Sequence, residues 1–224
     1  GSVRYANEVR TGRNIKQITH RALQFASSDP QGPVYVTAAR EILEEAVPPR
    51  EIAIDQWRPV IDSALSESDA RALAEALSKA RRPLIVTSYL GRRPEAVGIL
   101  ESVPSRMNFP HNHDLYQGNQ WNEPEQNDAL ADADCILVLD SDVPWISAHN
   151  RPRSDASIFH IDIDPLKQQM PLWHISAARS FRADAATALL QLRSALQNMD
   201  LDNDAIAERH DHYVKRHHAR AEAI

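Results

Sequence analysis

The sequence predicts an α/β protein built on a doubly wound parallel β-sheet, and three observations support this fold class. Short runs of consecutive apolar residues alternate along the chain with segments of helical periodicity. Continuous apolar runs are typical of parallel strands, because helices cover both faces of a parallel sheet. Turn-forming residues separate the segments, and 224 residues suffice for one domain with flanking pieces.

Residues 1–50 look like the end of a larger domain. Apolar residues recur on one helical face between Asn14 and Ala26, and the turn formers from Ser27 to Pro33 end this helix. The β-rich run Val34–Thr37 predicts a strand. One helix with one or two strands cannot close a core, so we expect this segment to need partners. Residues 51–66 contain no clear period and are interpreted as a linker.

Residues 67–197 carry the pattern of the main α/β domain. Ser66 to Asp69 form a capping-box-like start for a helix, and Pro83–Ser88 is a short apolar run that predicts a buried strand. The last stretch, 198–224, is charged and rich in histidine, so it is interpreted as an exposed linker or helix. The remaining elements are predicted as helices at 94–100, 127–133 and 183–196, and as strands at 135–139 and 158–163.

Composition excludes several classes of protein. The net charge of −6 argues against a partner with a phosphate backbone, so we expect no nucleic-acid binding. No stretch of about 18 apolar residues suggests a membrane span. Cys135 is the only cysteine and lies in an apolar run, which predicts a buried, inert thiol. We expect a location in the cytoplasm or an organelle matrix.

Polar residues follow three of the predicted strands. In open α/β sheets, ligands bind where the loops at the carboxyl ends of the strands converge. Arginine in such a loop would bind phosphate, and aspartate would accept hydrogen bonds from ribose hydroxyls. Aspartate after a strand is also a common helix cap or turn former, and both interpretations stay open. The loops in question are 89–93, 140–145 and 162–165.

Motifs of the common catalytic sites are absent from the sequence. No G-x-G-x-x-G follows a strand, and there is no P-loop lysine and no G-x-S-x-G elbow. His111-Asn112-His113-Asp114 and the histidines of 210–218 match no zinc spacing, so we interpret them as loop and tail polarity. Trp121, Trp145 and Trp173 are candidates for a stacking platform or for contacts between domains.

The order of these segments resembles that of thiamine-diphosphate-dependent enzymes, with acetolactate-synthase-like members the most similar. Gly32–Val36 resembles the G-P-V strand that ends the family's pyrimidine-binding domain, and Ala80–Val86 looks like the first helix-to-strand step of its central domain. The run Ala131–Leu139 resembles the A-D-x-x-L-x-x-G segment, and Ile158–Pro165 is similar to I-x-H-I-D-I-D-P. The resemblance covers nearly the whole chain in order.

The resemblance implies a subunit of three domains that works as a dimer or tetramer. This chain would then contact the flanking domains of the same protein. Thiamine diphosphate and Mg²⁺ would lie between the other two domains, where a ylide attacks a 2-keto acid or aldehyde. The activating glutamate and the G-D-G motif belong to those domains, and no G-D-G occurs in this chain. The resemblance therefore assigns no catalytic residue and no metal ligand here.

The family's central domain holds FAD in some members and ADP in others. By position, Gly91 and Arg92 match the loop after its first strand, Asp140 follows the Leu139 strand, and Asp162 and Asp164 match the adenosine side. Ser88–Gly91 stands where the family has a glycine-rich turn, and Asp140 stands where it has a strand-end glycine. Both differences argue against FAD binding. Since only about 14 residues follow Ser88 before the next apolar stretch, we predict a deletion near Gly98.

Three functions stay open at this point. The chain is the central domain of a thiamine-diphosphate enzyme, a standalone Rossmann-like module that binds an adenine nucleotide, or a domain that only positions its neighbours. The first and third are compatible. The unpartnered helix and strand before residue 50 favour them, because a standalone module does not need this segment.

Overall fold

The computed structural model describes residues 3–90, 109–119, 125–167, 170 and 175–222. The chain divides into two compact units, Gly1–Asp62 and Ser63–Ile224, and the division falls inside the stretch interpreted as a linker. The predicted helix at 94–100, the predicted deletion near Gly98, and Trp121 and Trp173 lie outside the described residues. Among the described residues, no helix is long and apolar enough to cross a membrane.

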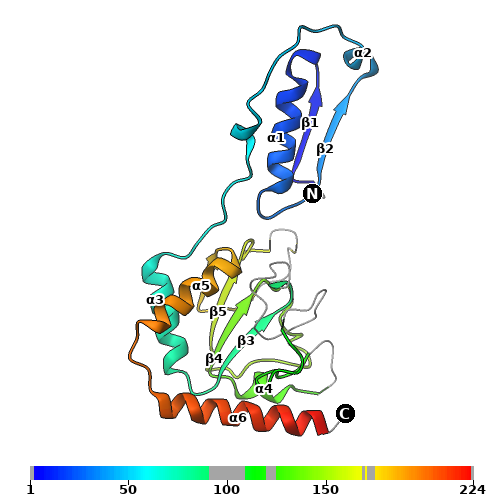
Figure 1. The fold of residues 1–224 in the computed structure, drawn as a ribbon. Coiled ribbons are helices and arrows are strands. Elements are labelled where there is room, and N and C mark those ends of the chain that lie inside the picture. Colours follow the sequence, from blue (N-terminus) through cyan, green and yellow to red (C-terminus); the bar gives the residue numbers. More distant parts are fainter. Residues whose placement is uncertain (1–2, 91–108, 120–124, 168–169, 171–174, 223–224) are drawn as a thin grey trace. The chain divides into compact units, whose positions relative to one another are not determined.

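The first unit is a single β-α-β motif with two parallel strands. Strand β1 (Tyr5–Val9) pairs with β2 (Val34–Ala38), and helix α1 (Ile15–Ser27) connects them and packs against both (Figure 1). The sequence predicted α1 and β2 but did not identify β1. Three shorter elements complete the unit, the 3-10 helices η1 (Gly12–Asn14) and η2 (Ile54–Trp57) and the helix α2 (Arg40–Leu43).

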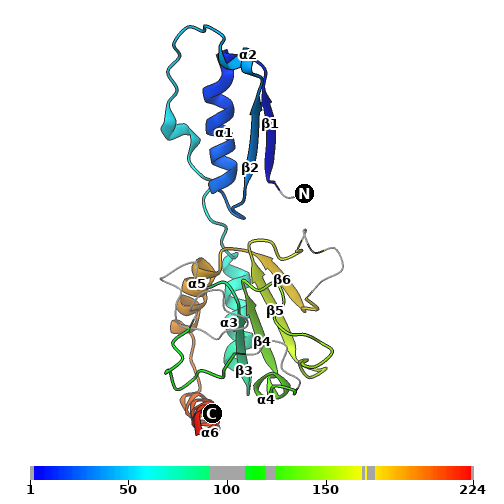
Figure 2. The same ribbon diagram turned by 90° about the vertical axis from the view of Figure 1, so that its right-hand side faces the viewer.

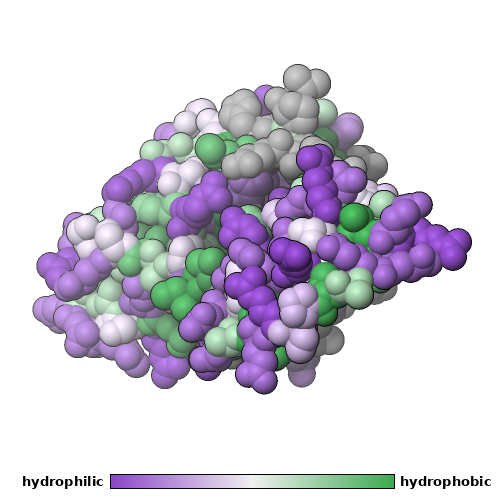
Figure 3. Space-filling model, turned by 90° about the horizontal axis from the view of Figure 1, so that it is seen from above, coloured by the Kyte–Doolittle hydropathy of each residue, from purple (hydrophilic) through white to green (hydrophobic). Residues whose placement is uncertain are grey.

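The core of this first unit is small. Its buried apolar residues in the described part are Val9, Ile18 and Ala22, whereas Tyr35 of β2 is 61% exposed and Ile61 is 90% exposed. Hydrophobic side chains are visible among hydrophilic ones on the surface in the space-filling view (Figure 3). Two strands and one helix leave much apolar surface in water, as the sequence indicated.

The second unit contains a four-stranded, fully parallel sheet in the order β3-β4-β5-β6, which confirms the predicted fold class (Figure 2). The sequence predicted the first three strands, but it missed β6 because that strand presents three polar residues and one apolar one. The strands are β3 (Pro83–Thr87), β4 (Cys135–Leu139), β5 (Ser157–Asp162) and β6 (Arg179–Arg182).

Helices cover both faces of this sheet. Alternate residues of β4 point to opposite sides, so that Leu137 packs toward α3 (Glu67–Lys79) and α5 (Ala185–Gln197), while Val138 packs toward α4 (Asp128–Asp132). All five residues of β4 are buried. Trp145 is 9% exposed and belongs to the α4 side of the core, so the prediction that it forms a stacking platform or domain contact is wrong.

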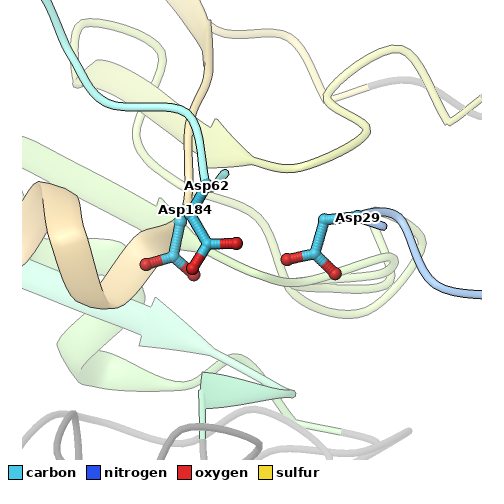
Figure 4. Close-up of side chains that lie close together, drawn as sticks. All are labelled: Asp29, Asp62 and Asp184. Carbon is cyan, nitrogen blue, oxygen red and sulfur yellow. The ribbon is translucent and has the colours of Figure 1, made fainter. Parts of the chain in front are cut away.

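Side-chain caps fix where these helices begin. Ser66 accepts a hydrogen bond from the Asp69 amide, as the capping-box pattern predicted, and Asn127 caps α4 in the same manner. Asp184 lies at the amino end of α5 (Figure 4) and accepts hydrogen bonds from the amide and the hydroxyl of Thr187. These oxygens pair with amide groups that the first helical turn leaves without partners.

Residues 203–222 form the last helix, α6 (Asn203–Glu222). The sequence interpretation as an exposed linker or helix is half correct, since α6 is a helix but one of its sides is attached to the unit. Tyr213 is buried and donates a hydrogen bond to the Pro83 carbonyl at the start of β3. Burial raises the pKa of Tyr213 to about 12, so this phenol stays protonated and remains a donor.

We predict that Cys135 reacts slowly with thiol reagents in the folded chain. Burial, together with the adjacent Asp134 carboxylate, raises the pKa of its thiol from a reference of 9.0 to about 11. The thiolate fraction at pH 8 is therefore about 100-fold lower than for a free cysteine, and burial also blocks access. Labelling with a chromogenic disulfide should be fast only in denaturant. Equal rates in both conditions would contradict a buried thiol.

Candidate functional site

Buried polar residues gather where β3, β4 and β5 end. The carboxyl ends of parallel strands meet at one edge of the sheet, which is where ligands bind in this class of fold. Ser88 and Ser141 join the first two strand ends through a hydroxyl–hydroxyl contact of 2.7 Å. The buried polar residues at this edge are Thr87, Ser88, Asp140, Ser141, Asp162 and Lys167.

An ion pair between Lys167 and Asp162 occupies the centre of this edge. The Lys167 Nζ lies 2.6 Å from Asp162 Oδ2 and 2.9 Å from Asp142 Oδ1, so one ammonium group bridges the loops after β4 and β5. The side chains of Lys167 and Asp162 are each 5% exposed, whereas that of Asp142 is 45% exposed. Two of the three charges are thus withdrawn from water, where hydration would otherwise stabilise them.

The turn after β5 brings Lys167 back to the strand that precedes it. Asp162 Oδ1 accepts a hydrogen bond from the Asp164 amide at 2.7 Å, and the Lys167 amide donates to the Asp164 carbonyl at 3.0 Å. Lys167 has a φ of 51°, a left-handed conformation that few residues other than glycine adopt. In this backbone conformation the Lys167 side chain reaches the Asp162 carboxylate.

Local charges determine the ionisation of this pair. Burial by itself would raise the pKa of Asp162, but the positive charge of Lys167 and the hydrogen bonds from Lys167 and the Asp164 amide outweigh it and lower the pKa to about 2. Burial would lower the pKa of Lys167, and the two carboxylates of Asp162 and Asp142 raise it instead. Both groups are therefore charged at neutral pH.

His160 is the other buried polar side chain of β5. It is fully buried, and its Nε2 lies 3.7 Å from Asp162 Oδ2, which exceeds hydrogen-bond distance. Within the described part of the chain, neither ring nitrogen has a hydrogen-bond partner. A histidine in the middle of a buried parallel strand departs from the apolar pattern, and this departure is the signal by which the sequence could have identified it.

Asp140 occupies a backbone position that suits glycine. Its φ is 43°, and its amide donates to the Ile161 carbonyl while its carbonyl accepts from the Tyr89 amide. The residue is only 4% exposed. Aspartate is among the few residues that tolerate left-handed φ, so the chain turns here as it would at the strand-end glycine that Asp140 replaces.

The predicted site residues have different outcomes. Gly91 and Arg92 lie outside the described residues. Asp140, Asp162 and Asp164 do lie at the same edge of the sheet. Their carboxylates do not form an open cradle, however, because Asp140 is buried and Asp162 is paired with Lys167. Lys167 was missed, since a single lysine in a polar loop has no signal of its own in the sequence.

The described residues at this edge leave little carboxylate capacity for FAD or ADP. A ribose that binds at the end of β5 needs a carboxylate whose lone pairs are available, and Asp162 already accepts hydrogen bonds from the Lys167 ammonium and the Asp164 amide. Asp164 Oδ1 lies 3.9 Å from Arg182 Nη2. A hollow of about 690 Å³ does exist beside Trp145 and Arg151, but Asp140, Asp162 and Asp164 are not among the described residues that line it.

A metal site is not formed within either unit by the described residues. No three histidine, cysteine or acidic side chains of a single unit bring their ligand atoms together there. In the histidine segments, His113 Nδ1 accepts from the Leu115 amide, and His217 Nδ1 donates to the Tyr116 carbonyl at 2.8 Å. Both contacts are to backbone groups of the loop at residues 109–119.

Solved structures show what this fold is similar to. The chain matches benzoylformate decarboxylase from Polynucleobacter necessarius with a TM-score of 0.67 and 18% identity, over 89% of this chain and 39% of that one. The fold matches part of thiamine-diphosphate enzymes. The chain spans about two fifths of the length of these structures. No family model and no curated protein sequence matches it.

Two further structures give the same result. A thiamin diphosphate-dependent enzyme from Mycobacterium smegmatis matches with a TM-score of 0.62 and 18% identity, over 91% of this chain and 40% of that one. The thiamine diphosphate-dependent 4-hydroxybenzoylformate decarboxylase of Rhodococcus jostii RHA1 matches with a TM-score of 0.62 and 19% identity, over 90% and 40%. At such identities the likeness shows the fold, in agreement with the family resemblance of the ordered segments.

We predict that Lys167→Met destabilises the second unit by about 3–5 kcal/mol, because it leaves the buried Asp162 carboxylate without its cation. The double variant Asp162→Asn with Lys167→Met should recover much of this loss, since no unpaired charge remains. Urea unfolding at pH 7 measures both. Asp142→Asn is the matched control, because Asp142 is half-exposed, and it should cost under about 1 kcal/mol. Additive single-variant effects would contradict the pairing.

The same pair predicts a pH window for stability. The folded pKa of Asp162 lies below its unfolded value of roughly 3.9, so its contribution is complete above that pH and is lost as the pH falls toward about 2. The raised pKa of Lys167 keeps its contribution complete below roughly pH 10.4. The Asp162→Asn, Lys167→Met variant should therefore lose less stability in acid than the unchanged chain does.

We predict that the chain tolerates Asp140→Asn and that Asp140→Val lowers the free energy of unfolding by roughly 1–2 kcal/mol more than Asp140→Asn does. A β-branched residue disfavours a left-handed backbone conformation. Both substitutions remove the same charge, so their difference isolates the backbone conformation. Thermal and urea unfolding of the two variants provide the comparison. Indistinguishable unfolding free energies would show that this turn imposes no requirement on φ.

Proposed function

We propose that residues 67–197 are the central, non-catalytic domain of a thiamine-diphosphate-dependent enzyme that acts on 2-keto acids. The observation that carries this proposal is the match over 89–91% of the chain to three solved structures, two of them described as decarboxylases of benzoylformate or 4-hydroxybenzoylformate and one as a thiamin diphosphate-dependent enzyme. The ordered segments of the sequence agree with it. Decarboxylation or carboligation by the full-length protein follows, with acetolactate-synthase-like chemistry as one form.

In this proposal the cofactors of the reaction bind outside this chain. Thiamine diphosphate and Mg²⁺ belong to the pyrimidine- and diphosphate-binding domains, and residues 1–50 are the end of the first of these. The exposed Tyr35 and the small core of the β1-α1-β2 unit support this, because a pair of parallel strands is stable only as part of a larger sheet. The flanking domains and a second subunit are the proposed partners.

The role proposed for the central domain is structural. The Lys167–Asp162 pair satisfies, from within the chain, the carboxylate that would bind ribose in a nucleotide-holding relative. The domain then positions its neighbours without a nucleotide. The second candidate function, a standalone module that binds an adenine nucleotide, needs the same carboxylate to be available.

Calorimetric titration distinguishes these two functions. We expect FAD, ADP and NAD to give no saturable heat with the 224-residue chain, because Asp162 is already paired. The chain should also release no CO₂ from benzoylformate or pyruvate when thiamine diphosphate and Mg²⁺ are supplied. Saturable ADP or FAD binding that is lost in Asp162→Asn but kept in Asp142→Asn would establish the nucleotide-binding module instead.

A further inference from the structure

Helix α6 is attached to the second unit mainly by polar contacts. Tyr213 is the only buried residue of this 20-residue helix, all of which is described. Helices α3 and α5 are held differently from α6, since Leu73 of α3 and Leu192 of α5 lie in the apolar core of the sheet. Apolar burial supplies most of the free energy that holds a helix to a domain.

The first attachment point of α6 is the junction between α3 and β3. The Arg209 guanidinium donates to the carbonyls of Ser78 at 3.0 Å and Ala80 at 2.8 Å, and so caps the carboxyl end of α3. One turn later, Tyr213 Oη donates to the Pro83 carbonyl at 2.9 Å. The acceptors are therefore backbone carbonyls that a helix end and a strand start leave open.

The second attachment point is the loop at residues 109–119. Gln117 Nε2 donates to the Tyr213 carbonyl at 3.0 Å, and Arg220 Nη1 donates to the Gln117 carbonyl at 2.9 Å. Gly118 makes room for this arginine: it has a φ of 96°, and a Cβ there would lie 1.7 Å from Arg220 Nη1. Glycine is thus required at this position for α6 to reach the loop.

The same interface contains buried polar atoms that make no hydrogen bond within the described residues. They are Gln117 Oε1, His212 Nε2 and Arg216 Nη1. Each such atom loses its hydration without a replacement partner, which opposes docking of the helix. The net stabilisation of a hydrogen bond in water is small. These bonds, together with the partly exposed Arg216–Asp132 pair and the His217 bond to the Tyr116 carbonyl, therefore hold α6 less firmly than apolar burial holds α3 and α5.

We propose that α6 is a strap that opens as one unit while the four-stranded sheet and helices α3, α4 and α5 stay folded. Opening releases the carbonyl groups of Ser78, Ala80 and Pro83 to solvent. It leaves the apolar core intact, because only Tyr213 leaves a buried position. A released helix of this length is marginal in water, so the open strap unwinds in part.

Hydrogen–deuterium exchange of the full chain, followed by mass spectrometry under native conditions, tests this proposal. Amides of α6 should exchange at least about tenfold faster than those of β4 and α5, because a sub-global opening needs less free energy than global unfolding. Exchange of α6 at the same rate as β4 and α5 would overturn the proposal, since the helix would then open only when the whole unit unfolds.

Variants separate the strap from the core. Arg209→Met removes two hydrogen bonds to carbonyls, and Gly118→Ala displaces Arg220 from the Gln117 carbonyl, so each should raise the exchange of α6 amides by at least about tenfold and leave β4 unchanged. Lys215→Met alters the exposed side of the same helix and is the matched control, which should change nothing. Faster exchange across β4 in both Arg209→Met and Gly118→Ala would show that α6 belongs to the cooperative core.

Discussion

A parallel sheet that is buried on both faces is the constraint on which the second unit depends. Its backbone groups pair only with neighbouring strands, and its side chains need cover above and below, so every residue of β4 is buried. Helices α3 and α5 on one face and α4 on the other meet this need. Apart from His160, the buried polar residues of the described strands then lie at the strand ends, and the candidate site forms there.

Charges at this edge are balanced from within the chain. Asp162 is the last residue of β5, and burial makes the negative charge of its carboxylate unfavourable. The turn after β5 brings the Lys167 ammonium to 2.6 Å from this carboxylate, and its positive charge compensates. At this edge Asp162 and Lys167 use their polar capacity for each other. This internal pairing supports the structural role that we propose for residues 67–197.

Both ends of the sequence bury less apolar surface than the sheet does. The β1-α1-β2 unit buries few apolar side chains, and α6 buries only Tyr213. Apolar burial makes the sheet cooperative, while elements held by hydrogen bonds to backbone carbonyls are separable from it at lower cost.

The sequence by itself determined the fold class and most elements, because apolar runs and caps such as Ser66 act locally. It also indicated the edge of the sheet where Asp140, Asp162 and Asp164 lie. Only the tertiary structure decided that Lys167 fills that edge and that α6 packs on β3. These contacts are made across turns and long loops. The sequence pattern around a single lysine or a polar helix does not indicate which residues it will contact. Strand β6 was missed for the same reason, since pairing with β5 rather than its own apolarity makes it a strand.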